Sequence, residues 1–248
     1  IAGIAMERAT GKSWEQIVSE KILKPLRMKD TNFSIGALRS SSNFASPYLQ
    51  KNEIKRMAHR DLSLITPAAG INSSVSDMSR WVQMLLSWGV FESRSVLSSS
   101  TLNELFTVQP YSVSQETMGL GWRIDEFSGC KQVSHDGVID GFTSLVSLLP
   151  EKGIGVVVLS NKNLSPLPRL LAMHIFDRLL GLPRKEWFQE GKEAIEKEKM
   201  LFLAEQKKES HMSRKGPAHE LDEYTGEYAH PGYGALQVGL FKGALHLF

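Results

Sequence analysis

The segment from Gly119 to Ser160 limits the possible folds of this chain more than any other. It contains four short runs rich in apolar and β-branched residues, separated by turn sequences, which is the pattern of consecutive β-strands. The turn Pro150-Glu151-Lys152-Gly153 is a good hairpin connection. The sequence therefore predicts an antiparallel meander. Its predicted strands are Gly119–Ile124, Lys131–His135, Phe142–Leu149 and Ile154–Ser160.

Helical patterns lie on both sides of this segment in the sequence. Residues 1–9 are typical of a helix, and apolar residues from Leu170 to Leu180 predict another. Three more helices have polar residues placed to cap their first turns. Residues 36–66 show no clear periodicity and predict a long, partly irregular excursion of the kind that often borders a binding cleft. The capping residues are Ser13 with Gln16, Ser74 with Asp77, and Thr101 with Glu104.

The composition of the C-terminal region predicts a division of the chain into three parts. Residues 183–218 are dominated by Lys and Glu and predict a charged helical linker between a main domain, 1–182, and the start of a small β domain, 219–248. The chain opens inside a helical pattern and closes inside a strand pattern, so we expect both ends to be truncated. A signal peptide or membrane anchor would precede residue 1, which leaves the localisation open.

Composition excludes several classes of function. A formal net charge of +2, with basic and acidic residues interspersed, does not favour a nucleic-acid or membrane surface. Cys130 is the only cysteine, so an intrachain disulfide and a zinc site made of several cysteines are excluded. The histidines are scattered without ligand spacing, and we expect no metal site and no cofactor.

The tract from Val133 to Phe142 is the candidate site. Here a strand leads into two glycines, Gly137 and Gly141, that bracket polar side chains. A strand containing glycine can accept a peptide-like ligand as an added strand, and one of its N–H groups can form half of an oxyanion hole. His135 would supply a donor or a positive charge to the substrate. The alternative for this tract alone is a β-turn with a surface histidine.

The order of short motifs along residues 1–180 resembles the β-lactamase-related serine hydrolases. This family includes class C β-lactamases, penicillin-binding proteins, D-aminopeptidases and some esterases. The tail from Leu221 resembles the small β domain of unknown function that often follows. The motifs are Glu7-Arg8-Ala9-Thr10-Gly11-Lys12-Ser13-Trp14, Leu23-Lys24-Pro25-Leu26-Arg27-Met28-Lys29-Asp30-Thr31, Pro67-Ala68-Ala69-Gly70-Ile71-Asn72-Ser73, Asp77-Met78-Ser79-Arg80-Trp81, Gly119-Leu120-Gly121-Trp122, His135-Asp136-Gly137 and Gly153 to Asn161.

The resemblance implies an α+β fold of two lobes, in which helices flank an antiparallel sheet, N-terminally truncated and followed by a small β unit. It also implies three converging motifs: Ser-x-x-Lys, Tyr-x-Asn and, on the edge strand, Lys-Thr-Gly or His-x-Gly. Only the third is present, so His135 and Gly137 would bind substrate and the N–H of Val138 would be the oxyanion donor. The nucleophile and its partners are expected upstream of residue 1, so no catalytic residue is assigned here.

The resemblance implies acyl-enzyme hydrolysis of amide or ester bonds in a small-molecule or peptide-like substrate. Residues 1–248 alone are expected to be inactive, and without the first strands of the family's sheet we expect an exposed apolar sheet face and aggregation. The alternative function is a non-catalytic binding or matrix protein that retains the fold. Substrate identity, oligomeric state and any membrane anchor stay open.

Other candidates have simpler interpretations. Ser128-Gly129-Cys130-Lys131 fits Ser-x-x-Lys in letters, but its glycine and flanking strands predict a hairpin loop. Ser41-Ser42-Asn43 has no accompanying tyrosine or base and predicts a solvated loop. Trp81 and Trp122 are predicted to pack in the core, while Asp136 is expected to face solvent.

Overall fold

The computed structural model describes residues 1–50, 53–110, 117–193, 216–231 and 234–248. It divides into two compact units, Ile1–Gly191 and Lys192–Phe248. Most of the predicted charged linker, residues 194–215, lies outside the described residues. Among the described helices, none is long and apolar enough to span a membrane.

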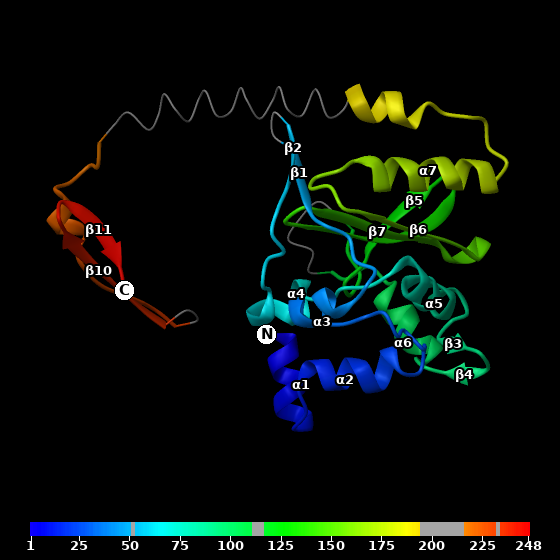
Figure 1. The fold of residues 1–248 in the computed structure, drawn as a ribbon, viewed down its shortest axis with the longest axis horizontal. Coiled ribbons are helices and arrows are strands. Elements are labelled where there is room, and N and C mark those ends of the chain that lie inside the picture. The colour runs from blue at the N-terminus through cyan, green and yellow to red at the C-terminus, as the bar shows by residue number, and fades with distance from the viewer. Residues whose placement is uncertain (51–52, 111–116, 194–215, 232–233) are drawn as a thin grey trace. The chain divides into compact units, whose positions relative to one another are not determined.

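A four-stranded antiparallel sheet is the centre of the first unit (Figure 1). Its strand order, β5-β6-β7-β8, confirms the predicted meander. The first strand begins later than predicted, because Gly121 adopts a left-handed conformation with φ of 79° and turns the chain before Arg123. The second strand extends past His135 to Ile139. The bounds are Arg123–Phe127 for β5, Cys130–Ile139 for β6, Phe142–Leu149 for β7 and Ile154–Ser160 for β8.

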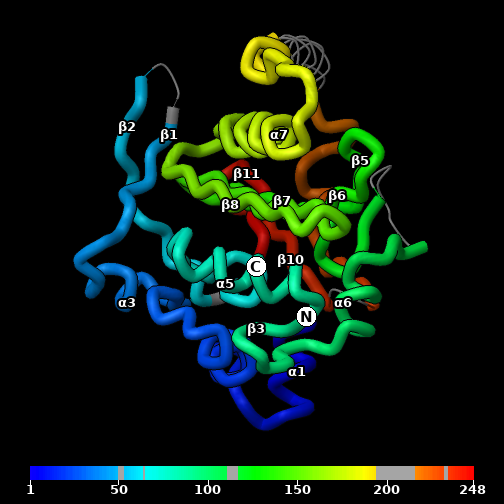
Figure 2. The backbone as a smooth tube through the Cα atoms, turned by 90° about the vertical axis from the view of Figure 1, so that its right-hand side faces the viewer, coloured from blue at the N-terminus to red at the C-terminus, as the bar shows by residue number. Residues whose placement is uncertain are grey.

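Two helices cover opposite faces of this sheet (Figure 2): α5, Val75–Leu86, and α7, Leu167–Leu179. On the α5 side, Val133 of β6 lies in one buried cluster with Leu148 and Leu85. On the α7 side, Cys130 lies in a second cluster with Leu145 and Phe176. Because side chains alternate along a strand, odd-numbered residues of β6 face α5 and even-numbered residues face α7.

The sheet faces and the sheet edge differ in exposure. The prediction of an exposed apolar sheet face is wrong for the first unit, because helices cover both faces of the sheet. The outer edge of β8 is different, because within the described ranges this strand pairs only with β7. The expectation of aggregation stays a prediction, and it now rests on this unpaired edge.

The remaining helices of the first unit precede or connect these elements. Their bounds are Ala2–Thr10 for α1, Trp14–Val18 for α2 with a π-helical continuation over Ser19–Leu23, Ile35–Ser40 for α3, Thr66–Ala69 for α4 after a 3₁₀ turn over Ser63–Ile65, and Ser99–Leu105 for α6. Two small hairpins accompany them, Tyr48–Gln50 (β1) with Ile54–Arg56 (β2), and Val90–Phe91 (β3) with Arg94–Ser95 (β4). The sequence did not predict α3 or the β1–β2 hairpin within the irregular excursion.

Two of the three predicted caps are confirmed. Ser13 and Gln16 form a reciprocal capping box on α2, and Ser74 accepts a hydrogen bond from the N–H of Asp77 on α5. The third cap was predicted three residues too late. Ser98, rather than Thr101, caps α6 and accepts from the N–H of Thr101 at 3.0 Å. The run of four hydroxyl residues, 98 to 101, offered the same chemistry at each position.

Asp77 does more than begin a helix. Its side chain is fully buried and accepts hydrogen bonds at 2.8 Å from both the N–H of Asp30 and the hydroxyl of Thr31. Arg80, one turn along α5, pairs with its other oxygen at 2.6 Å. Asp77 therefore fixes the segment after Met28 against α5, because an unpaired buried carboxylate would be strongly destabilising.

The second unit is the small β unit that the alternating pattern near the C-terminus predicts. It is an antiparallel sheet of order β11-β10-β9, preceded by a 3₁₀ turn over Leu221–Tyr224. The hydroxyl of Tyr228 donates to the carbonyl of Tyr224 at 3.0 Å and ties the turn to the sheet. The strands are Gly226–His230 (β9), Gly234–Phe241 (β10) and Ala244–Leu247 (β11).

Candidate functional site

Strand β6 pairs with β5 over residues 130–134 and with β7 over residues 133–139, so Val133 and Ser134 are paired on both sides. Its pairing with β5 ends where Ser134 lies opposite Arg123, whereas its pairing with β7 continues to Ile139. Within the part of the chain that the structure describes, residues 135–139 therefore have a partner strand on one side alone. We call this segment the open half of β6. An open strand edge can accept an extended ligand by backbone hydrogen bonds.

The backbone groups of Asp136 and Val138 point toward the open side. A two-residue hairpin closes on residues that exchange hydrogen bonds, and hydrogen bonding alternates along an antiparallel strand. Both hairpins of β6 give the same result: even-numbered residues direct N–H and C=O toward the β5 side, and odd-numbered residues direct them toward β7. Beyond Ser134, no described strand receives the even-numbered groups. The closing pairs are Phe127 with Cys130 and Ile139 with Phe142.

His135 lies at the start of the open half, on the α5 face, with its side chain exposed. Its Nδ1 is 2.7 Å from the carbonyl oxygen of Gly121. Because a carbonyl only accepts, Nδ1 carries the hydrogen and Nε2 is left to contact a ligand. The buried ring of Trp122 meets the imidazole edge to face at a centroid distance of 6.4 Å. The turn at residues 121–122 therefore sets the orientation of His135.

Gly137 and Val138 continue the open half. A β-carbon on Gly137 would lie 2.7 Å from the hydroxyl oxygen of Ser144, its partner on β7, so a side chain here would displace Ser144. The side chain of Val138 is 46% exposed on the opposite face. The structure thus places His135, Gly137 and the Val138 amide on one short segment, as the His-x-Gly reading predicts, while their roles stay predictions.

The two segments that match catalytic motifs only in their letters adopt the structures that the sequence predicts. Ser128 and Gly129, with φ of 50° and 78°, form the tight turn between β5 and β6, which confirms that Ser128-x-x-Lys131 is not on a helix. Ser41 is exposed and its hydroxyl accepts from the N–H of Asn43 at 3.2 Å, as in a local turn. Asp136 is exposed, with its carboxylate 3.9 Å from the guanidinium of Arg123.

Trp122 is buried in the α5-side cluster, as predicted, and its contact with His135 adds a role that sequence reasoning missed. The signal for it was the Gly-Leu-Gly-Trp motif, in which Gly121 permits the turn. Among the described residues, no group of three or more His, Cys, Asp or Glu side chains is arranged to hold a metal ion.

Comparison with known proteins places these features in a family. The Beta-lactamase family model matches residues 1–180. A curated relative, the unguisins hydrolase ungD' of Aspergillus campestris, is 26% identical over 96% of this chain and 47% of its own length.

Solved structures share the fold. The octameric penicillin-binding protein homologue from Pyrococcus abyssi aligns with a TM-score of 0.63 at 22% identity, over 99% of this chain and 50% of that one. A class C β-lactamase aligns with a TM-score of 0.57 at 19% identity, over 74% of this chain and 55% of that one. The chain thus spans about half the length of these proteins. Because the family model covers most of the chain, and helices flank an antiparallel sheet as the family's fold requires, the chain belongs to the Beta-lactamase family.

Proposed function

We propose that this chain carries the substrate-binding edge of a serine hydrolase that cleaves amide or ester bonds through an acyl-enzyme. The observation that carries the proposal is the open half of β6, where the N–H of Val138 points away from β7 beside an oriented histidine. A backbone N–H held on a rigid strand can stabilise the oxyanion that forms when a carbonyl is attacked.

In this mechanism, a serine oxygen bonds to the substrate carbonyl carbon, whose oxygen accepts a hydrogen bond from Val138 N–H. The amine or alcohol leaves with a proton, and water then releases the acyl group. The extended part of the substrate pairs with the groups of Asp136 and Val138, and Nε2 of His135 contacts it. The nucleophile would come from outside residues 1–248, because this sequence has no helical Ser-x-x-Lys and no Tyr-x-Asn, and its relatives are about twice as long.

The test uses the full-length protein with a chromogenic ester and a cephalosporin, and follows hydrolysis and the mass of the acylated protein. We expect His135→Ala to lower kcat/KM by roughly 10- to 100-fold, the worth of a hydrogen bond to a charged group. The control is His246→Ala, an exposed histidine in the second unit.

Two results would contradict the proposal. One is a full-length protein that binds these compounds without ever being acylated, which would favour a non-catalytic binding protein. The other is equal hydrolysis by the His135→Ala and wild-type proteins. Residues 1–248 alone should show no turnover, and turnover that a serine-acylating reagent abolishes would contradict the assigned place of the nucleophile.

A further inference from the structure

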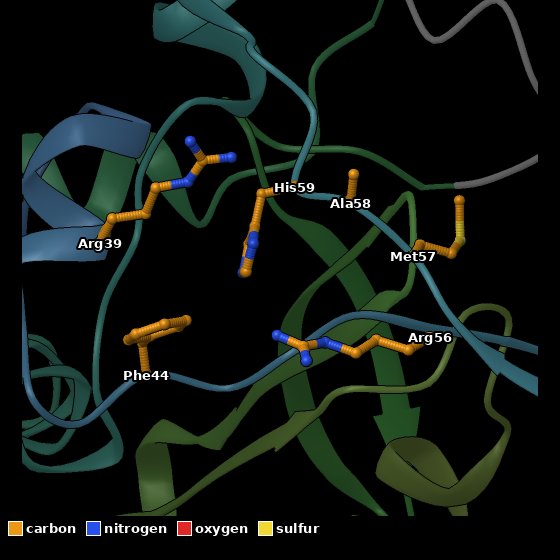
Figure 3. A pocket seen from close by; sticks show the side chains of 6 residues that line it. All are labelled: Arg39, Phe44, Arg56, Met57, Ala58 and His59. Carbon is orange, nitrogen blue, oxygen red and sulfur yellow. The ribbon is translucent and has the colours of Figure 1, made fainter.

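A pocket of about 510 Å³ is lined by the end of α3 and by the excursion that follows it, away from His135 in the sequence. Its volume is within the usual range for small-molecule sites. Figure 3 shows Arg39 and Arg56 reaching in from opposite sides, with the ring of His59 between them and Phe44 beside it. Met57 and Ala58 complete the lining.

The two arginines give this pocket a positive charge that no described carboxylate neutralises. Two neighbouring basic residues, by contrast, have acidic partners: Lys55 lies 3.8 Å from Glu53, and Arg60 pairs with Asp140 at 2.9 Å. No such ion pair involves Arg39 or Arg56 within the described residues. Two unpaired guanidinium groups on one concavity favour an anion, and their planar donors suit a carboxylate.

Apolar groups share the pocket with these charges. The ring of Phe44 meets His59 edge to face at a centroid distance of 5.7 Å, and Phe44 is 39% exposed. Nε2 of His59 lies 3.1 Å from the carbonyl oxygen of Ala45, which fixes the imidazole in the pocket wall. A ligand with both an apolar part and an anionic group therefore matches this lining better than an inorganic ion does.

The pocket wall is attached to the turn at the end of the open half of β6. The N–H of Tyr48 donates to the carbonyl of Gly141 at 3.3 Å, and the ring of His59 lies 6.1 Å from that of Phe142. Gly141 has a φ of 92°, and a β-carbon there would lie 2.3 Å from Pro47. Glycine is thus required where the excursion contacts this turn, and the pocket is held close to the end of β6.

From these contacts we infer that Arg39, Phe44, Arg56 and His59 form a binding site for an organic carboxylate with an apolar portion. The site needs neither a nucleophile nor turnover, so its test is independent of the proposed hydrolysis. The positive charges of Arg39 and Arg56 attract the carboxylate, while Phe44 and Met57 contact the apolar part.

The test measures binding to the 248-residue chain by NMR titration with hippurate, an aromatic carboxylate, and with hippuramide, its uncharged counterpart. We expect hippurate to bind at least about ten times more tightly, the usual worth of a charge-assisted hydrogen bond. The double variant Arg39→Gln/Arg56→Gln should remove this preference. Arg94→Gln, an exposed arginine on β4, is the matched control and should keep it.

The proposal is wrong if hippurate and hippuramide bind equally, if neither gives a saturable shift, or if hippurate binds the double variant as tightly as the wild type. Because Arg39 and Arg56 are exposed, the variants should melt at the wild-type temperature. If the double variant unfolds, the single variants Arg39→Gln and Arg56→Gln decide, and each should weaken hippurate binding without changing hippuramide binding.

Discussion

The two halves of β6 have the same secondary structure and different surroundings. Residues 130–134 pair with β5, the last two of them pair with β7 as well, and Val133 is fully buried opposite Leu148. Residues 135–139 pair only with β7, and Val138 is 46% exposed. A rigid strand that loses its neighbour partway along presents ordered but unused backbone donors, which is the arrangement an oxyanion site requires.

The largest difference between the halves should come from proline. Gln132 and Val138 both direct their N–H toward the β5 side, but only Gln132 has a strand to receive it. We expect Gln132→Pro to lower the free energy of unfolding by about 3 kcal/mol beyond Gln132→Ala, since a ladder bond is lost. Val138→Pro should cost only about 1 kcal/mol, because proline is tolerated at strand edges.

Urea unfolding followed by tryptophan fluorescence checks this, because all five tryptophans lie in the first unit. Equal losses in the free energy of unfolding for Gln132→Pro and Val138→Pro would show that the amide of Val138 has a hydrogen-bond partner.

A smaller difference is expected from packing. Val133→Ala should cost about 2 kcal/mol, because it leaves a cavity between β6 and α5, whereas Val138→Ala should cost less than about 0.5 kcal/mol. The same urea experiment measures both. A Val138→Ala cost close to that of Val133→Ala would mean that the open half is covered.

The smallest effect concerns the charge on the open half. Asp136 is exposed and 3.9 Å from Arg123, so Asp136→Ala should change the free energy of unfolding by less than about 0.5 kcal/mol. Repeating the measurement at high salt should reduce even that, because exposed pairs are screened. A loss above 1 kcal/mol would indicate that Asp136 is a structural residue.

Local signals predicted much of the fold. The capping box of Ser13 and the strands β7 and β8 follow from residues near one another in sequence, and their predicted positions agree with the structure. The predicted start of β5 was wrong, because the sequence pattern around Gly121 fits a strand and a turn equally well. The β1–β2 hairpin has no alternating pattern, since its three residues at each strand are too few to show one.

The candidate site was predictable only in part, for a related reason. The motif named His135 and Gly137, but the open half depends on where β5 ends opposite β6, which is a property of two strands together. Likewise, Arg39 and Arg56 are separated by an irregular segment, and only the folded hairpin brings them to one pocket. Contacts between distant segments are what single-sequence patterns do not contain.

The most direct test of the central proposal compares Val138→Pro with Val138→Ala in a protein that also contains the proposed nucleophile. Both substitutions replace the exposed side chain of Val138, but only proline removes the backbone N–H that is proposed to hold the oxyanion. Acylation by a cephalosporin or a chromogenic ester, measured by single-turnover kinetics, should fall by about 100- to 1000-fold for Val138→Pro and stay near wild type for Val138→Ala. Equal acylation rates for the two variants would contradict the proposal that the N–H of Val138, in the open half of β6, holds the oxyanion.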